Sequence, residues 1–172
     1  MSLDKEHENI SKPISFNKKP SIADLYKALD SGYDEHIAME LGFALDKAGK
    51  EFDATRHYLS ALSGSLLPEE KIHVYFCLAS SYRNTNQSNK AKKLINKAIK
   101  EFPDKSLFPI MKSLINLDEK RIDLAVHTLI TVVYKHVKEE NLAPYVWLLK
   151  KEAIRQRRAL KKNSILCRAL ID

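Results

Sequence analysis

Apolar residues recur every three or four positions along most of the chain, which is the period of a helix with one buried face. The first such run follows Ser21, a residue type that caps helices, and stops at residues 30–32, which include a glycine. No segment shows the alternation and hairpin turns of strands, so the chain is expected to be all-α. Further helices are predicted at about 34–47, 51–63, 68–82, 89–101, 105–117, 121–138, 144–160 and 164–170.

Turn-forming residues separate these helices. Gly49 is expected to stop the second helix, and Pro68 with two acidic residues after it begins the fourth. Ser88 is the expected cap of the fifth helix. Pro103 ends that helix, because proline disfavours helical backbone in the residue before it.

Two stretches of the pattern match each other position by position, 37 residues apart. Small residues alternate with large apolar ones in both, because two antiparallel helices approach closely only where side chains are small. One helix pair leaves an apolar face uncovered, so an internal repeat of this length indicates stacked units. The matched positions are Leu41 and Leu78, Gly42 and Ala79, Leu45 and Tyr82, Gly49 and Asn86, Ala54 and Ala91, Tyr58 and Ile95, and Ala61 and Ala98.

This pattern resembles the tetratricopeptide repeat, with copies at 35–68 and 72–105. The chain as a whole resembles a small bacterial protein of that family, a group whose members often lack an assigned function. The resemblance implies a right-handed superhelix of antiparallel helix pairs, a solenoid, with flanking N- and C-terminal helices. A degenerate third copy at 106–139 keeps Ser113 at the small position, but Lys112 and Asn116 replace large apolar residues there.

Length and composition fit one helical domain at 21–172, preceded by a flexible arm at 1–20 and closed by a basic capping helix at 144–170. The two cysteines, Cys77 and Cys167, make no disulfide framework, which favours a reducing compartment. No apolar run approaches the roughly 20 residues of a membrane span. The N-terminus lacks the apolar stretch of a secretory signal. A cytoplasmic protein without membrane contact is therefore expected.

In the tetratricopeptide family the first helix of each pair lines a concave groove, so the resemblance implies a groove here that binds a peptide or helix of a partner protein. Apolar burial would dominate binding, with Lys47, Arg83 and Asn84 orienting the partner. Met39 and Phe43 stand where family members that grip a C-terminal carboxylate begin their basic clamp, so no such clamp is expected. The implied groove residues are His36, Met39, Phe43, Asp46, Lys47, His73, Phe76, Ser80, Arg83, Asn84, Leu107, Ile110, Leu114, Leu117 and Asp118.

The apolar residues of the implied groove have a second interpretation. They can be ordinary core, covered by the chain's own C-terminal helix or by a second copy in a homo-oligomer. The helix predicted at 105–117 sharpens this alternative, because its apolar residues cover about half its circumference. Such a helix packs against two neighbours or leaves apolar surface for a partner. The helix predicted at 144–160 would provide cover, with Trp147 as a packing anchor or, alternatively, a ligand-stacking residue.

The formal charge of +7 is concentrated in the C-terminal segment, where eight Lys and Arg residues accompany a single acid. The segment is either the solvated face of a terminal helix or a patch for nucleic acid or another polyanion. The solvated face is preferred because no nucleic-acid motif accompanies the charge. The basic residues are Lys150, Lys151, Arg155, Arg157, Arg158, Lys161, Lys162 and Arg168.

No residue pattern predicts catalysis, a cofactor or a metal. Cys77 lies among apolar residues, which indicates packing and not a low-pKa nucleophile. His36 and His73 occupy equivalent repeat positions, but two histidines alone make a poor metal site, so both are expected to be solvated. The chain has no Gly-rich phosphate loop and no Cys-x-x-Cys pair. The sequence therefore predicts a non-catalytic protein-interaction module.

Overall fold

The computed structural model describes residues 19–136 and four separate positions, 148, 151, 154 and 158. Every regular element in the described part of the chain is an α-helix, which confirms the predicted all-α class. The helices are α1 (Ile22–Ser31), α2 (Glu35–Lys47), α3 (Glu51–Leu62), α4 (Pro68–Asn84), α5 (Ser88–Glu101), α6 (Leu107–Asp118) and α7 (Ile122–His136).

Some of the predicted features lie outside these described residues. They are the first 18 residues of the N-terminal arm, most of the basic capping helix with Trp147, and the short helix predicted at 164–170. The seven helices that are described begin and end within about two residues of the predicted positions, except that the end predicted for the last of them, at 138, lies outside the described residues.

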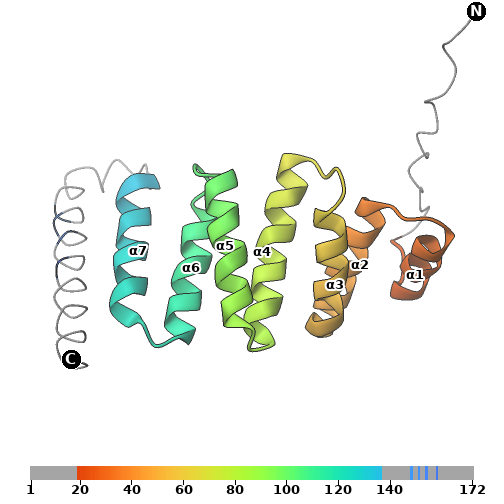
Figure 1. Ribbon diagram of the computed structural model, residues 1–172, viewed down its shortest axis with the longest axis horizontal. Coiled ribbons are helices and arrows are strands. Elements are labelled where there is room, and N and C mark those ends of the chain that lie inside the picture. The colour runs from red at the N-terminus through yellow and green to blue at the C-terminus, as the bar shows by residue number, and fades with distance from the viewer. Residues whose placement is uncertain (1–18, 137–147, 149–150, 152–153, 155–157, 159–172) are drawn as a thin grey trace, which may run out of the picture.

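The helices stand side by side in chain order, from α1 at one end to α7 at the other (Figure 1). Each helix contacts the next along the chain, and contacts also join α2 to α4 and α4 to α6. By contrast, no Cα atoms of α3 and α5, or of α5 and α7, lie within 8 Å of each other. We call α2, α4 and α6 the even row, and α3, α5 and α7 the odd row. The even row is therefore continuous, whereas the helices of the odd row are separated.

The same turn closes all three helix pairs. A residue in left-handed backbone conformation follows the first helix of each pair: Gly49 with φ 71°, Asn86 with φ 59° and Lys120 with φ 57°. The next amide then donates to the carbonyl five residues before it, which is a pattern that closes helix C-termini. These bonds are Lys50 to Leu45 at 2.9 Å, Gln87 to Tyr82 at 2.7 Å and Arg121 to Asn116 at 2.8 Å. The third pair thus keeps the turn of the first two, although lysine is unfavourable in this conformation.

The predicted close approach of the helices in the first pair is confirmed. Gly42 on α2 is buried, and a Cβ atom at this position would lie 2.6 Å from two ring carbons of Tyr58 on α3. The ring of Tyr58 is fully buried. The second pair carries Ala79 and Ile95 at the equivalent positions, and both are fully buried. The second pair thus has alanine in place of glycine, and the smaller isoleucine in place of tyrosine.

The sequence predicted the caps of two helices, and the structure confirms one of them. Ser21 caps α1 as predicted, because its hydroxyl accepts the amide of Asp24 at 3.2 Å and the Asp24 carboxylate accepts the Ser21 amide at 2.9 Å. Ser88, in contrast, is the first residue of α5 and not its cap. The left-handed turn at Asn86 leaves only Gln87 before the helix, and the Gln87 carbonyl accepts the first helical bonds.

Asn116 on α6 is the buried polar residue that the repeat pattern marked as a departure. It is 1% exposed, and its side-chain nitrogen has no hydrogen-bond partner among the described residues. Leu45 and Tyr82 occupy the same place in the other two pairs. Leucine is apolar, and tyrosine is apolar except for its hydroxyl. A buried amide without a partner costs stability, so the third pair is locally less stable.

We expect Gly42→Ala to lower the free energy of unfolding by about 1–3 kcal/mol, because the new methyl group meets the buried Tyr58 ring. Urea unfolding followed by circular dichroism measures the change. The control is Gly32→Ala, since Gly32 is exposed and nothing lies within 4 Å of a Cβ there. In the double variant with Tyr58→Ile the two effects should not add, because the methyl group then has room. Full additivity would show that the two residues do not set the helix spacing.

We expect Asn116→Leu to raise the free energy of unfolding by about 1 kcal/mol, because it removes the unpartnered buried amide. The control is Asn96→Leu on α5, which should be destabilising because the Asn96 side chain accepts a 2.8 Å bond from Lys112. The same unfolding measurement applies to both variants. A loss of stability in Asn116→Leu would mean that the amide has a role which the fold alone does not explain.

Candidate functional site

The surface of the even row contains the groove residues that the resemblance implied, and the structure places them at three depths. The exposed ones are His36, Lys47, His73, Asn84, Ile110, Leu117 and Asp118. The half-buried ones are Phe43, Asp46, Phe76, Ser80, Arg83, Leu107 and Leu114. Met39 alone among them is buried, at 7% exposure, so it offers little surface to a partner. Its helix, α2, packs among three neighbours, α1, α3 and α4.

Polar contacts fix the spacing between neighbouring helices of the even row. Ser81 on α4 donates to Asp46 on α2 at 3.2 Å, and these residues are 35 positions apart. Arg83 on α4 and Asp118 on α6 are also 35 positions apart, and two bonds of 2.6 and 3.0 Å join them. Because the guanidinium of Arg83 is held by this bidentate pair, it is less free to orient a partner than the sequence suggested.

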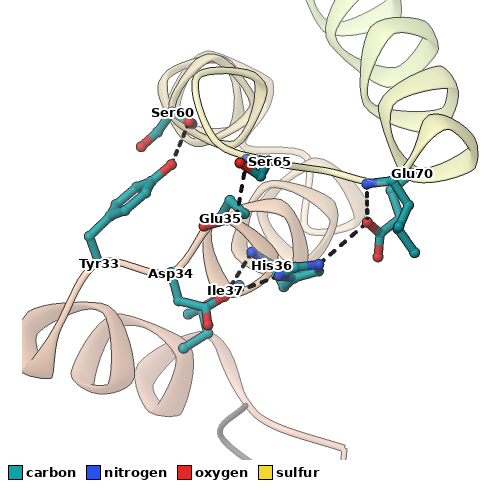
Figure 2. A network of polar contacts seen from close by, with 9 residues as sticks. Tyr33, Asp34, Glu35, His36, Ile37, Ser60, Ser65 and Glu70 are labelled. Carbon is teal, nitrogen blue, oxygen red and sulfur yellow. Dashed lines mark hydrogen bonds and ion pairs between the residues drawn. The ribbon is translucent and has the colours of Figure 1, made fainter. Parts of the chain in front are cut away.

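A second polar network joins the start of α2 to the linker before α4 (Figure 2). Asp34 caps α2 by accepting the amides of His36 and Ile37 at 2.8 and 3.0 Å. The ring of His36 lies 3.4 Å from the carboxylate of Glu70, which also accepts the Leu67 amide at 2.9 Å. His36 is therefore solvated, as predicted, but it also bridges two helices of the even row.

The linker between the first two pairs is held close to α2. The Ser65 amide in this linker donates to Glu35 on α2 at 3.1 Å, whereas the Tyr33 hydroxyl, before α2, donates to the Ser60 carbonyl on α3 at 2.6 Å (Figure 2). A Cβ at Gly64 would lie 2.5 Å from the Cβ of Glu35, so only glycine fits there without a shift. These contacts fix where the second pair begins relative to the first.

A half-buried polar cluster lies where α2, α3 and α4 meet. Both Tyr58 and Ser81 donate to the carboxylate of Asp46, at 3.3 and 3.2 Å. Burial raises the pKa of Asp46, and these two bonds oppose that effect. Burial also raises the pKa of the Cys77 thiol, and the nearby charge of Asp46 adds to the rise. A thiol with a raised pKa is a poor nucleophile, so the cluster has the chemistry of a structural junction.

Sequence reasoning missed a row of charge on α5. Lys90, Lys93, Lys97 and Lys100 are all exposed on this helix. The signal was present as lysine spacings of three and four residues, which place side chains on one helix face. It was hidden because the net charge outside the C-terminal segment is zero. A count over the whole chain therefore conceals a local basic surface.

The described part of the chain contains no group of three or more His, Cys, Asp or Glu residues placed to hold a metal ion. Within the same residues, no helix combines the length and the apolar character that crossing a bilayer requires. Of the predicted basic C-terminal patch, only Lys151 and Arg158 are described, and both are exposed. The other members of that patch lie outside the described residues.

Comparisons with known proteins give no match to a family model, to a curated protein or to a solved structure. The resemblance to tetratricopeptide repeats therefore rests on the residue pattern. The family, the non-catalytic role and the cytoplasmic location stay predictions from the sequence.

Glu101 at the end of α5 provides a pH-dependent test of how α4 and α5 are joined. Its carboxylate bonds Lys71 at 2.6 Å and Tyr75 at 2.8 Å, and these bonds, that of Lys71 first, hold the pKa of Glu101 below its ordinary value of 4.5. A lowered pKa in the folded state gives stability that is present above pH 4.5 and is lost as the pH falls through the folded-state pKa. We expect Glu101→Gln to destabilise the protein at pH 7 by less than about 1 kcal/mol, because the pair is partly exposed.

The difference between Glu101→Gln and the wild type should shrink between pH 7 and the lowest pH at which the protein stays folded, because the wild-type carboxylate takes up a proton as the pH falls. Urea midpoints at the two pH values measure it. The matched control is Glu40→Gln, an exposed residue on α2. An equal loss at both pH values would show that the ionised form of Glu101 makes no specific contribution.

Proposed function

We propose that the chain is a solenoid of the tetratricopeptide type, and that its even row binds a helix or an extended peptide of a partner protein without catalysis. The proposal is supported by three pairs closed by the same turn, and by contacts that join α2 to α4 and α4 to α6. A continuous row of this kind offers one long surface, as repeat proteins do.

The observation that carries the proposal is the apolar character of the accessible positions on that row. Phe43, Phe76 and Leu114 are half-buried on three successive helices of the row. On α6, Ile110 and Leu117 are more open, at 37% and 43% exposure. Apolar side chains at these depths supply the burial that a peptide-binding groove needs, with polar groups beside them.

Polar residues at the edge of this surface would orient the bound peptide. Lys47 and Asn84 are exposed at the C-terminal ends of α2 and α4, and His73 is exposed near the start of α4. Arg83 has its bidentate partner in Asp118, so its contribution is to hold α4 against α6. The proposed rim thus differs from the one expected from the sequence, where Arg83 had an orienting role.

Ser80→Arg tests the proposal, because Ser80 is a half-buried small residue in the middle of the even row on α4. A long charged side chain there would obstruct the surface without removing a core residue. Peptides selected from a random library on the immobilised wild type should lose at least tenfold in affinity for Ser80→Arg. Fluorescence anisotropy with labelled peptides measures this loss.

The matched control is Thr55→Arg on α3, which adds the same charge at a half-buried position of the odd row. It should bind the selected peptides like the wild type, and circular dichroism should show that both variants fold. If the selected peptides bind Ser80→Arg as tightly as the wild type, or if selection yields no specific peptide, recognition by the even row is wrong.

A further inference from the structure

The exposed side of α5 carries a straight row of four lysines. Lys90, Lys93, Lys97 and Lys100 fall within about 80° of the helix circumference and extend over about 15 Å of its axis. All four are exposed, whereas Ala91, Ile95 and Ala98 bury the opposite face of the helix. The lysines therefore project from one fixed side of the molecule. We call these four residues the lysine row.

Two residues of the lysine row are held in position by tyrosines. The ammonium of Lys90 lies 5.6 Å from the ring centre of Tyr82, and that of Lys97 lies 5.9 Å from the ring centre of Tyr75. The lysines are seven positions apart on α5, and the tyrosines are seven positions apart on α4. These cation–π contacts restrict the side chains and so reduce the entropy that binding would cost.

Acidic residues do little to neutralise the lysine row. No carboxylate within residues 19–136 lies at ion-pair distance from any of its four members. Glu101, the acid of α5, is paired with Lys71. The remaining lysine of the helix, Lys92, is paired with Glu119. The row thus faces solvent without an ion pair in residues 19–136, and Glu101, whose charge also interacts with Lys97, is bonded to Lys71.

We infer that the lysine row binds the phosphate backbone of duplex nucleic acid without reading its sequence. Lysines act as point charges toward phosphates, and evenly spaced ones suit a regular array of them. Duplex DNA carries about one charge per 1.7 Å of axis, so a row of about 15 Å meets several phosphates.

The surroundings of the row favour a duplex over an apolar protein interface or a single strand. No large apolar side chain of α5 is exposed, so a protein partner would lack the buried anchors that dominate protein interfaces. Single strands are bound largely by stacking of bases on open aromatic rings. Here Tyr75 and Tyr82 are buried beneath the lysines and offer no such platform.

This surface is separate from the even row, so either function can fail without the other. The test is a salt titration with a labelled 20-base-pair DNA duplex of arbitrary sequence, followed by fluorescence anisotropy on the full chain. Lys90, Lys93, Lys97 and Lys100 are changed together to Gln, which keeps helix propensity. We expect more than tenfold weaker binding at 50 mM salt. The slope of log K against log salt should become shallower by about 3 to 4, since each phosphate contact contributes about 0.9.

The matched control changes four other exposed lysines to Gln, namely Lys19, Lys27, Lys50 and Lys135. It has the same net charge and the same C-terminal segment as the test variant, and its affinity should fall less than threefold. Changing the lysine row to Arg should preserve binding. A smaller variant, Lys93→Gln with Lys100→Gln, leaves the two tyrosine contacts intact and should lose about half of the slope change.

Three results would overturn the inference. The first is equal binding by the test and control variants, which would place the interaction in the C-terminal segment. The second is tighter binding of a single-stranded oligonucleotide than of the duplex. The third is equal affinity for polyglutamate, which would show a response to charge alone and no preference for a phosphate backbone.

Discussion

The distance between the two helices of a pair depends on the contact between Gly42 and the ring of Tyr58. Because the glycine has no side chain, α3 lies close enough to α2 for the ring to be fully buried. The hydroxyl of Tyr58 then reaches Asp46, which also accepts the bond from Ser81 of the next pair. Packing within one pair therefore fixes the polar contact between pairs, and that contact places the helices of the even row.

Much of the fold could be predicted from local sequence because its signals are local. The cap at Ser21, the left-handed turns at Gly49 and Asn86, and the proline that begins α4 each act within a few residues. The left-handed conformation of Lys120 has no such local signal, because lysine is unfavourable in it. The error at Ser88 was local too, since the length of the preceding turn decides which residue can cap.

The candidate site was less predictable, because its geometry depends on residues far apart in the chain. The burial of Met39 follows from three neighbouring helices, which spacing along α2 alone does not reveal. The pairing of Arg83 with Asp118 similarly turns a predicted ligand-orienting residue into a structural one. The lysines of α5 could have been found from their spacing, but balanced charges elsewhere concealed them. Solvent-facing charge is best judged helix by helix.

The repeated turn also bears on how the molecule responds to mechanical force. Each pair is closed by its own hydrogen bonds, and in the described helices no contact reaches beyond the second neighbour. Tension between the two ends would be carried through each junction in series. Extension would then occur in steps of one pair, beginning with α6 and α7, whose junction contains the strained Lys120 and the unpartnered amide of Asn116. Lys120 and Asn116 would therefore decide which helix pair extends first.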